Sequence, residues 1–176
     1  GGVMDPSILR SMEITFYDSQ YNNILDASWQ SNLGIRLPAT VQLDGGELYP
    51  NVMVRYKGNS TYAIPRDQGN PKVPYNLDFN DSVEGQQLMG YNKIKLANAI
   101  FDPTFAKEIT AYNIYKRYLP TPEANLMQLT VQGDYLGLYV NTESVDRKFL
   151  KKHFGENKGV LFKCDPIQQF GQNNGP

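Results

Sequence analysis

Cysteine and histidine are almost absent from this chain of 176 residues, which contains one of each. The single cysteine, Cys164, excludes a disulfide within the chain and any zinc site built from several cysteines. The single histidine, His153, excludes a histidine-rich metal site and argues against a Ser-His-Asp triad. It lies in a basic segment before Gly155 that predicts a helix C-terminus, so we expect His153 to be structural.

Long apolar runs and an excess of either charge are also missing. No apolar run reaches the length of a membrane span. The formal net charge of −1 argues against nucleic acid as the main partner, because phosphate backbones attract basic surfaces. Charged residues at 20% and aromatic residues at 12% indicate a folded globular chain, long enough for one domain with a core. We expect it to be a monomer.

The segment from Val52 to Thr61 combines a strand pattern with a polar, flexible end. Apolar residues alternate in its first half, and its second half is small and polar. Arg55 and Lys57 project from one strand face, and Gly58 lets a ligand approach the backbone closely. Two cations beside a turn with unused backbone donors indicate an anion site. The alternative is an ordinary strand end with a Gly-Asn turn, in which Arg55 forms an ion pair within the sheet.

Strand and helix patterns alternate through the rest of the chain. The proline-rich residues 62–74 are expected to be irregular, since they hold three prolines and a glycine. Asp102 and Pro103 predict the start of the clearest helix. We expect further strands at residues 12–17, 39–43, 75–79, 93–97, 126–131, 135–140 and 159–163, and helices at 22–31, 101–119 and 146–154.

Several of these segments together resemble the CotH family, which is named for a spore coat protein and related to atypical protein kinases. Residues 52–61, Val-Met-Val-Arg-Tyr-Lys-Gly-Asn-Ser-Thr, are similar to the family's strand-and-turn signature. Similar segments follow in the family's order: Lys72 with residues 74–79, Asp102-Pro103, residues 131–140 with Glu143 and Asp146, and residues 159–164.

Two features depart from the family pattern. The sequence reads Lys72-Val73-Pro74-Tyr75 where the family usually has Lys-Lys/Arg-Ser-Tyr. The family's later acidic motif has no counterpart here, so no metal ligand is assigned in this chain. We therefore expect an N-terminal portion that lacks the metal-binding acids and has little or no phosphoryl-transfer activity alone.

The resemblance implies an α+β fold: a protein-kinase-like small lobe, made of an antiparallel β-sheet with one packed helix, then a hinge and the start of a large lobe. The small lobe would span residues 1–140. The hinge and the incomplete start of the large lobe would span residues 141–176. The helix expected at 101–119 would be the one packed on the sheet.

The resemblance also implies an ATP-dependent protein kinase that uses ATP and Mg²⁺ to phosphorylate Ser or Thr of a protein. Gly58, Asn59 and Ser60 would cover the phosphates through backbone donors. Lys72 would bind the phosphates, with Arg55 or Lys57 as less favoured substitutes. Glu108 would orient Lys72, and the hinge residues Val140, Asn141 and Glu143 would bind the nucleotide.

Most of these assignments have a structural alternative. Lys72 is equally well a solvated loop lysine, and Glu108 a surface carboxylate. Glu143 would in that case cap the helix that begins near Asp146, and Asp102 is favoured as a helix cap over a metal ligand.

Three functions remain open at this point. The first is a CotH-type ATP-dependent protein kinase. The second is a non-catalytic coat, surface or adhesion module that binds protein or glycan through a tyrosine-rich face. The third is a free-standing β-rich binding domain. The resemblance favours a bacterial protein that is secreted, at the cell surface or in the spore coat.

Overall fold

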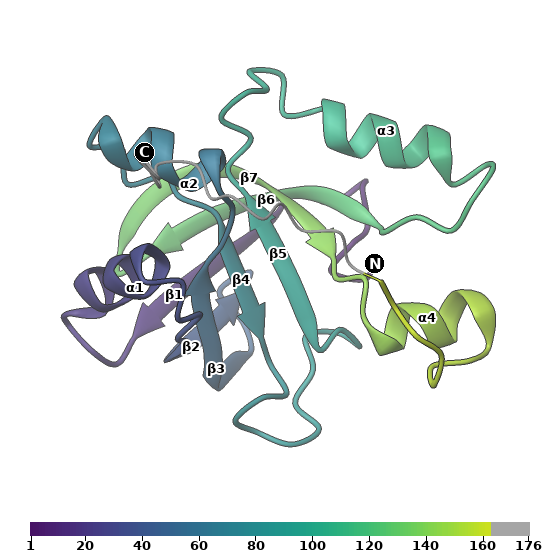
Figure 1. The fold of residues 1–176 in the computed structure, drawn as a ribbon, viewed down its shortest axis with the longest axis horizontal. Coiled ribbons are helices and arrows are strands. Elements are labelled where there is room, and N and C mark those ends of the chain that lie inside the picture. The colour runs from purple at the N-terminus through teal and green to yellow at the C-terminus, as the bar shows by residue number, and fades with distance from the viewer. Residues whose placement is uncertain (163–176) are drawn as a thin grey trace, which may run out of the picture.

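Seven strands form a closed barrel in the computed structural model, which describes residues 1–162 (Figure 1). The order around the barrel is β1-β2-β3-β4-β5-β7-β6. Neighbouring strands are antiparallel except β1 and β6, which run parallel and close the barrel. The strands are β1 (Arg10–Phe16), β2 (Leu37–Leu43), β3 (Leu48–Tyr56), β4 (Tyr75–Asp78), β5 (Lys93–Ala97), β6 (Ala124–Val131) and β7 (Asp134–Glu143).

This barrel corrects the fold class expected from the resemblance. A protein-kinase-like small-lobe sheet with one packed helix is wrong, because β1 pairs with β6 and closes the sheet. Alternation predicts single strands, and tight turns predict hairpins between sequence neighbours. The pairing of Arg10 with Met127 joins strands separated by most of the chain, so no local pattern reveals it. The division expected at residue 140 falls within β7 and stays a prediction.

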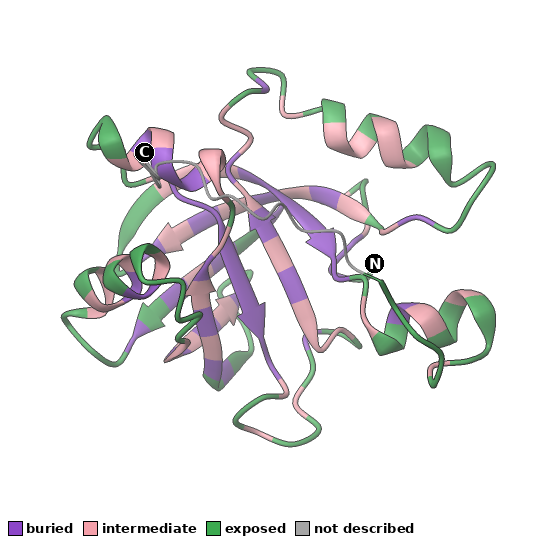
Figure 2. Cartoon of the chain, in the orientation of Figure 1, coloured by how far each residue is buried: buried purple, intermediate pink, exposed green. Residues whose placement is uncertain are grey.

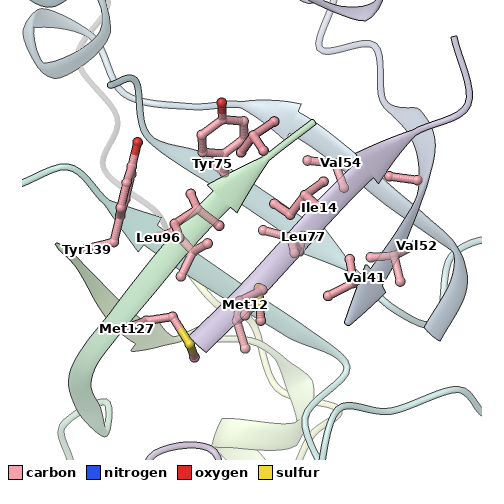
Figure 3. Close-up of a cluster of buried hydrophobic side chains, with 14 of the residues drawn as sticks. Met12, Ile14, Val41, Val52, Val54, Tyr75, Leu77, Leu96, Met127 and Tyr139 are labelled. Atoms are coloured by element: carbon pink, nitrogen blue, oxygen red, sulfur yellow. The ribbon is translucent and has the colours of Figure 1, made fainter. Parts of the chain in front are cut away.

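The apolar members of the alternating strands fill the barrel. Met12 and Ile14 of β1 are buried, whereas Ser11 before them and Thr15 after them are exposed. Figure 3 shows Met12, Ile14, Leu77 and other buried side chains from several strands gathered in the interior. This confirms the strands predicted at 12–17, 39–43, 75–79 and 93–97 and the hairpin of 126–131 with 135–140, with ends shifted by a few residues.

Four helices accompany the barrel in residues 1–162: α1 (Tyr21–Gln30), α2 (Ser60–Asp67), α3 (Lys107–Tyr115) and α4 (Arg147–Phe154). α1 and α4 confirm the helices predicted at 22–31 and 146–154. α4 follows Asp146, whose side chain accepts hydrogen bonds from the N–H groups of Lys148 and Phe149. It ends at Gly155, which has a φ of 70°.

α2 occupies a segment that was expected to be irregular. The expectation followed from the prolines, and Pro65 does lie inside the helix. Tyr62 and Ala63 on the same helix are buried, so packing against the rest of the molecule offsets the hydrogen bond that Pro65 cannot donate. Residues 68–74 form no regular element.

α3 is shorter than the predicted helix at 101–119, and it is not the packed helix that was expected. None of its residues is buried, and it lies at the edge of the barrel, where Glu108 accepts a hydrogen bond from Thr142 of β7 (Figures 1 and 2). Phe105 has a φ of 57°, which interrupts a right-handed helix before α3. Asp102 accepts hydrogen bonds from the N–H groups of Thr104 and Lys107, so it stabilises the preceding turn.

The strand expected at 159–163 is not present in residues 159–162, and Lys163 lies outside the described residues. Cys164 also lies outside them. No helix within residues 1–162 is both long enough and apolar enough to cross a bilayer.

Candidate functional site

A cleft of about 700 Å³ lies on the outer face of β3, β4, β5 and β7. Residues at and after the end of α1 line one side, and Glu108 and Tyr112 of α3 line another. Its volume is within the range of about 300–1,000 Å³ that is usual for small-molecule sites. Six residues singled out from the sequence line it together: Arg55, Lys57, Gly58, Asn59, Glu108 and Glu143.

The floor of the cleft is a row of polar residues set by strand register. Arg55 of β3 lies opposite Asn76 of β4, Asn76 opposite Lys95 of β5, and Lys95 opposite Thr142 of β7. All four line the cleft. The row therefore places an arginine and a lysine two strands apart, about 10 Å, on one surface.

A second arginine strengthens the positive potential beneath this row. The Arg36 guanidinium donates to the backbone oxygen of Met53 at 3.0 Å and to Asn76 Oδ1 at 2.8 Å. Burial lowers the pKa of Arg36, and the nearby charge of Arg55 lowers it further. Among residues 1–162, none of the ion pairs in the structure includes Arg55. The in-sheet ion pair that was the alternative reading of Arg55 is therefore not formed within these residues.

The turn after β3 forms one edge of the cleft. Gly58 has a φ of 86°, and a Cβ at this position would lie 2.2 Å from Thr61 Oγ1 and 3.1 Å from Pro74 Cγ. Lys57 N–H donates to the Pro74 carbonyl at 3.0 Å, which ties the turn to the residues before β4. α2 begins directly after Asn59 without a side-chain cap, so its first N–H groups add partial positive charge.

The opposite side of the cleft is acidic. Glu108 Oε1 accepts a hydrogen bond of 3.0 Å from Thr142 Oγ1. Burial raises the pKa of Tyr112 to about 12, with a further contribution from Glu108. Glu143 is buried; its Oε2 accepts from the Glu123 N–H at 3.1 Å, and its Oε1 lies 3.4 Å from Lys152 Nζ. Asp146, and not Glu143, provides the N-cap of α4.

The four other residues assigned from the resemblance do not line the cleft. Ser60 is the first residue of α2. Val140 and Asn141 lie inside β7, between β5 and β6, and both are buried. The Asn141 side chain donates to Asn125 Oδ1 at 3.0 Å, at the end of the barrel that contacts Val3.

Lys72 lies against aromatic rings and not beside Glu108. Its Nζ is 4.6 Å from the centre of the Phe105 ring and 5.3 Å from that of Tyr139. Burial lowers the pKa of Lys72. The ion pairs within residues 1–162 do not join Lys72 to Glu108, so the structure does not bring the expected pair together.

A match to a known protein family covers most of the cleft. The family described as CotH kinase protein matches residues 54–175, more than half of the chain. The chain belongs to the CotH kinase protein family. The matched region includes every part of the chain that lines the cleft, from Arg55 of β3 onward, except α1 and residues 32–35 after it. A search of curated proteins found no match.

Sequence reasoning missed two prominent residues of this CotH-family cleft. The strand pattern at 93–97 does not single out Lys95, since the register that places it in the row with Arg55 is not visible in the sequence. Trp29 was unassigned in a predicted helix, yet its Nε1–H donates to the Gly58 carbonyl at 2.8 Å. The only available signal for Trp29 was that it is the single tryptophan of the chain.

Proposed function

We propose that this chain binds ATP in the cleft, as part of a CotH-type protein kinase that phosphorylates Ser or Thr of a protein. Family membership supports the reaction class. The observation that carries the proposal is the convergence of Arg55, Lys57 and Lys95 on one cleft beside Gly58. Cationic side chains next to a glycine turn and a helix N-terminus are the groups that bind phosphates.

The charge distribution gives the nucleotide an orientation. Arg55, Lys57 and Lys95 neutralise the triphosphate, and Gly58 lets its oxygens approach the backbone. Glu108 and Glu143 lie elsewhere in the lining and repel phosphate. The triphosphate is therefore confined to the end of the cleft next to the Gly58 turn. Phosphoryl transfer depends on this positioning and charge neutralisation more than on covalent chemistry by the protein.

The described residues do not fit a resident Mg²⁺ ion. No group of three or more His, Cys, Asp or Glu side chains is placed to hold a metal within residues 1–162. Glu143 already accepts the Glu123 N–H and contacts Lys152. In this proposal Mg²⁺ would arrive bound to the ATP phosphates.

Titration calorimetry of the 176-residue chain with ATP, inorganic triphosphate and AMP tests the proposal. We expect ATP and triphosphate to bind, and AMP to bind more weakly. The affinities for ATP and triphosphate should fall as the salt concentration is raised. Absence of ATP binding would refute nucleotide recognition. An assay with γ-labelled ATP and an added protein substrate measures phosphoryl transfer by the same chain, for which we expect little or none.

The second candidate is a non-catalytic coat, surface or adhesion module that binds protein or glycan. It is favoured by exposed apolar and aromatic side chains at and after the end of α3, where Ile114, Tyr115, Tyr118 and Leu119 are all more than half exposed. Such residues suit contact with another macromolecule. Failure of ATP to bind, together with unchanged protein binding after the cleft cations are substituted, would select this candidate.

A further inference from the structure

We infer that Trp29 is a positioning residue, which holds the Gly58–Asn59 turn in the shape that faces the cleft. Its indole Nε1–H donates to the Gly58 carbonyl at 2.8 Å, across 29 residues of sequence. Gly58 carries a φ of 86° and precedes an uncapped helix. Fixing its carbonyl fixes the peptide plane that carries the Asn59 N–H, because the peptide unit is planar.

The indole is itself held by α2. The Trp29 ring stacks on Tyr62 with centres 4.1 Å apart and planes inclined by 28°. The Tyr62 hydroxyl donates to Asp26 Oδ1, one helical turn before Trp29 on α1. Burial raises the pKa of Tyr62, and so does its bond to Asp26, so the phenol stays protonated and remains a donor.

Arg66 adds a further link between α1 and α2, so that Asp26, Tyr62 and Arg66 together form a clamp joining the two helices. Its Nε lies 3.1 Å from Asp26 Oδ1, and its guanidinium carbon lies 5.2 Å from the centre of the Tyr56 ring. The clamp holds the indole through its stacking on Tyr62. The hydrogen bond from the indole N–H to the Gly58 carbonyl then connects the clamp to the turn. The clamp leaves the indole little freedom, so its hydrogen bond costs little entropy to form.

A consequence for ATP affinity follows, and it rests on the proposed function. Without the indole N–H, the turn samples other shapes, and its backbone donors meet the phosphates less often. We expect the dissociation constant for ATP to rise about three- to tenfold, since one net hydrogen bond is worth about that factor. The strands of the barrel, which do not depend on this bond, should be unaffected.

Because the chain contains a single tryptophan, a tryptophan analogue incorporated throughout the chain changes this position alone. The test analogue is 3-benzothienylalanine, which keeps the bicyclic shape and replaces the N–H by sulfur. The matched control is 5-fluorotryptophan, which keeps the N–H. Trp29→Phe serves as a second variant that retains a ring to stack on Tyr62.

Two readouts are needed: ATP affinity by calorimetry, and amide hydrogen exchange of residues 57–61 without nucleotide. We expect the benzothienyl protein to show faster exchange in this segment and weaker ATP binding than the fluorotryptophan protein, with unchanged exchange in β1 and β6. Equal exchange and equal affinity in the two proteins would overturn the positioning role. Faster exchange in a protein that never binds ATP would instead overturn the proposed function and keep the positioning role.

Discussion

The two faces of β3, β4 and β5 differ sharply although they belong to the same short strands. On the inner face, Val54, Leu77 and Ile94 lie opposite one another in register, and each is fully buried. One residue along, the outer face carries Arg55, Asn76 and Lys95. The inner row removes apolar surface from water, which stabilises the fold. The outer row places two cations on one surface, an arrangement that suits an anionic ligand.

This comparison separates stability from binding. Substitutions in the inner row should lower the free energy of unfolding and reach the cleft only by disrupting the fold. Substitutions in the outer row should lower ligand affinity and leave unfolding almost unchanged. Variants in the two rows should therefore separate a loss of stability from a loss of binding.

The largest effect is expected for Leu77→Ala in the middle of the inner row. Truncating a fully buried leucine leaves a cavity, and we expect a loss of about 3 kcal/mol in the free energy of unfolding. Urea unfolding followed by circular dichroism measures it. Leu48→Ala is the matched control, since Leu48 lies on β3 and is 59% exposed, and it should change stability by less than about 0.5 kcal/mol. Equal losses for the two variants would contradict the placement of the core.

Gly58→Ala should affect both properties. A Cβ at position 58 would contact Thr61 and Pro74. The residue must also keep a positive φ, which alanine disfavours, so we expect a loss of about 2 kcal/mol in the free energy of unfolding. Displacement of the turn should also weaken ATP binding. Gly45→Ala is the control: Gly45 has a φ of 66° with open space around it, so it isolates the backbone strain. A loss for Gly58→Ala no larger than that for Gly45→Ala would exclude the steric contribution.

Arg55→Gln should affect binding alone. Removing one of the three cleft cations should weaken ATP binding about tenfold, or about 1.4 kcal/mol, and should reduce the dependence of affinity on salt. Unfolding should change by less than about 0.5 kcal/mol. Calorimetry at two salt concentrations is the measurement, with the exposed Lys151→Gln on α4 as the control. Similar losses of affinity in both variants would point to nonspecific attraction by total charge.

What the sequence could predict follows the same division between the two faces. Alternation identified most strands and their buried members, because a half-buried strand repeats every two residues. Strand parity placed Arg55 and Lys57 on one face, and the glycine turn was visible as a local motif. The alignment of Arg55 with Lys95 depends on the register of three strands. The closure of the barrel depends on the parallel pairing of β1 with β6, which are distant in the sequence. Neither leaves a local pattern.

Lys72 shows the limit of transferring a role by motif. Its segment departs from the family pattern at Val73 and Pro74, and its expected position relative to α3 depends on a helix packed on the sheet. The helix starts later, and the residue that comes to lie against the lysine is Phe105. The resemblance nevertheless implies that Lys72 binds the ATP phosphates, so this role needs a direct test.

Lys72→Met should give the smallest change in ATP affinity, smaller than that of Arg55→Gln, because Lys72 does not line the cleft. Methionine keeps an unbranched apolar chain against Phe105 and Tyr139. A fall in affinity as large as that of Arg55→Gln, measured by the same titration, would support Lys72 as the main phosphate ligand.

The same variant tests the buried charge through pH. Burial lowers the pKa of Lys72 below its ordinary 10.5, so between the two pKa values the unfolded chain holds a proton that the folded chain has released. The free energy of unfolding of the unsubstituted chain, relative to that of Lys72→Met, should therefore rise as pH increases through this window. Above pH 10.5 the lysine is neutral in both states, so the cost of burying its charge should vanish. Urea unfolding of both proteins across the window measures the difference. A constant difference would show that the ammonium group keeps its ordinary solvation beside the two rings.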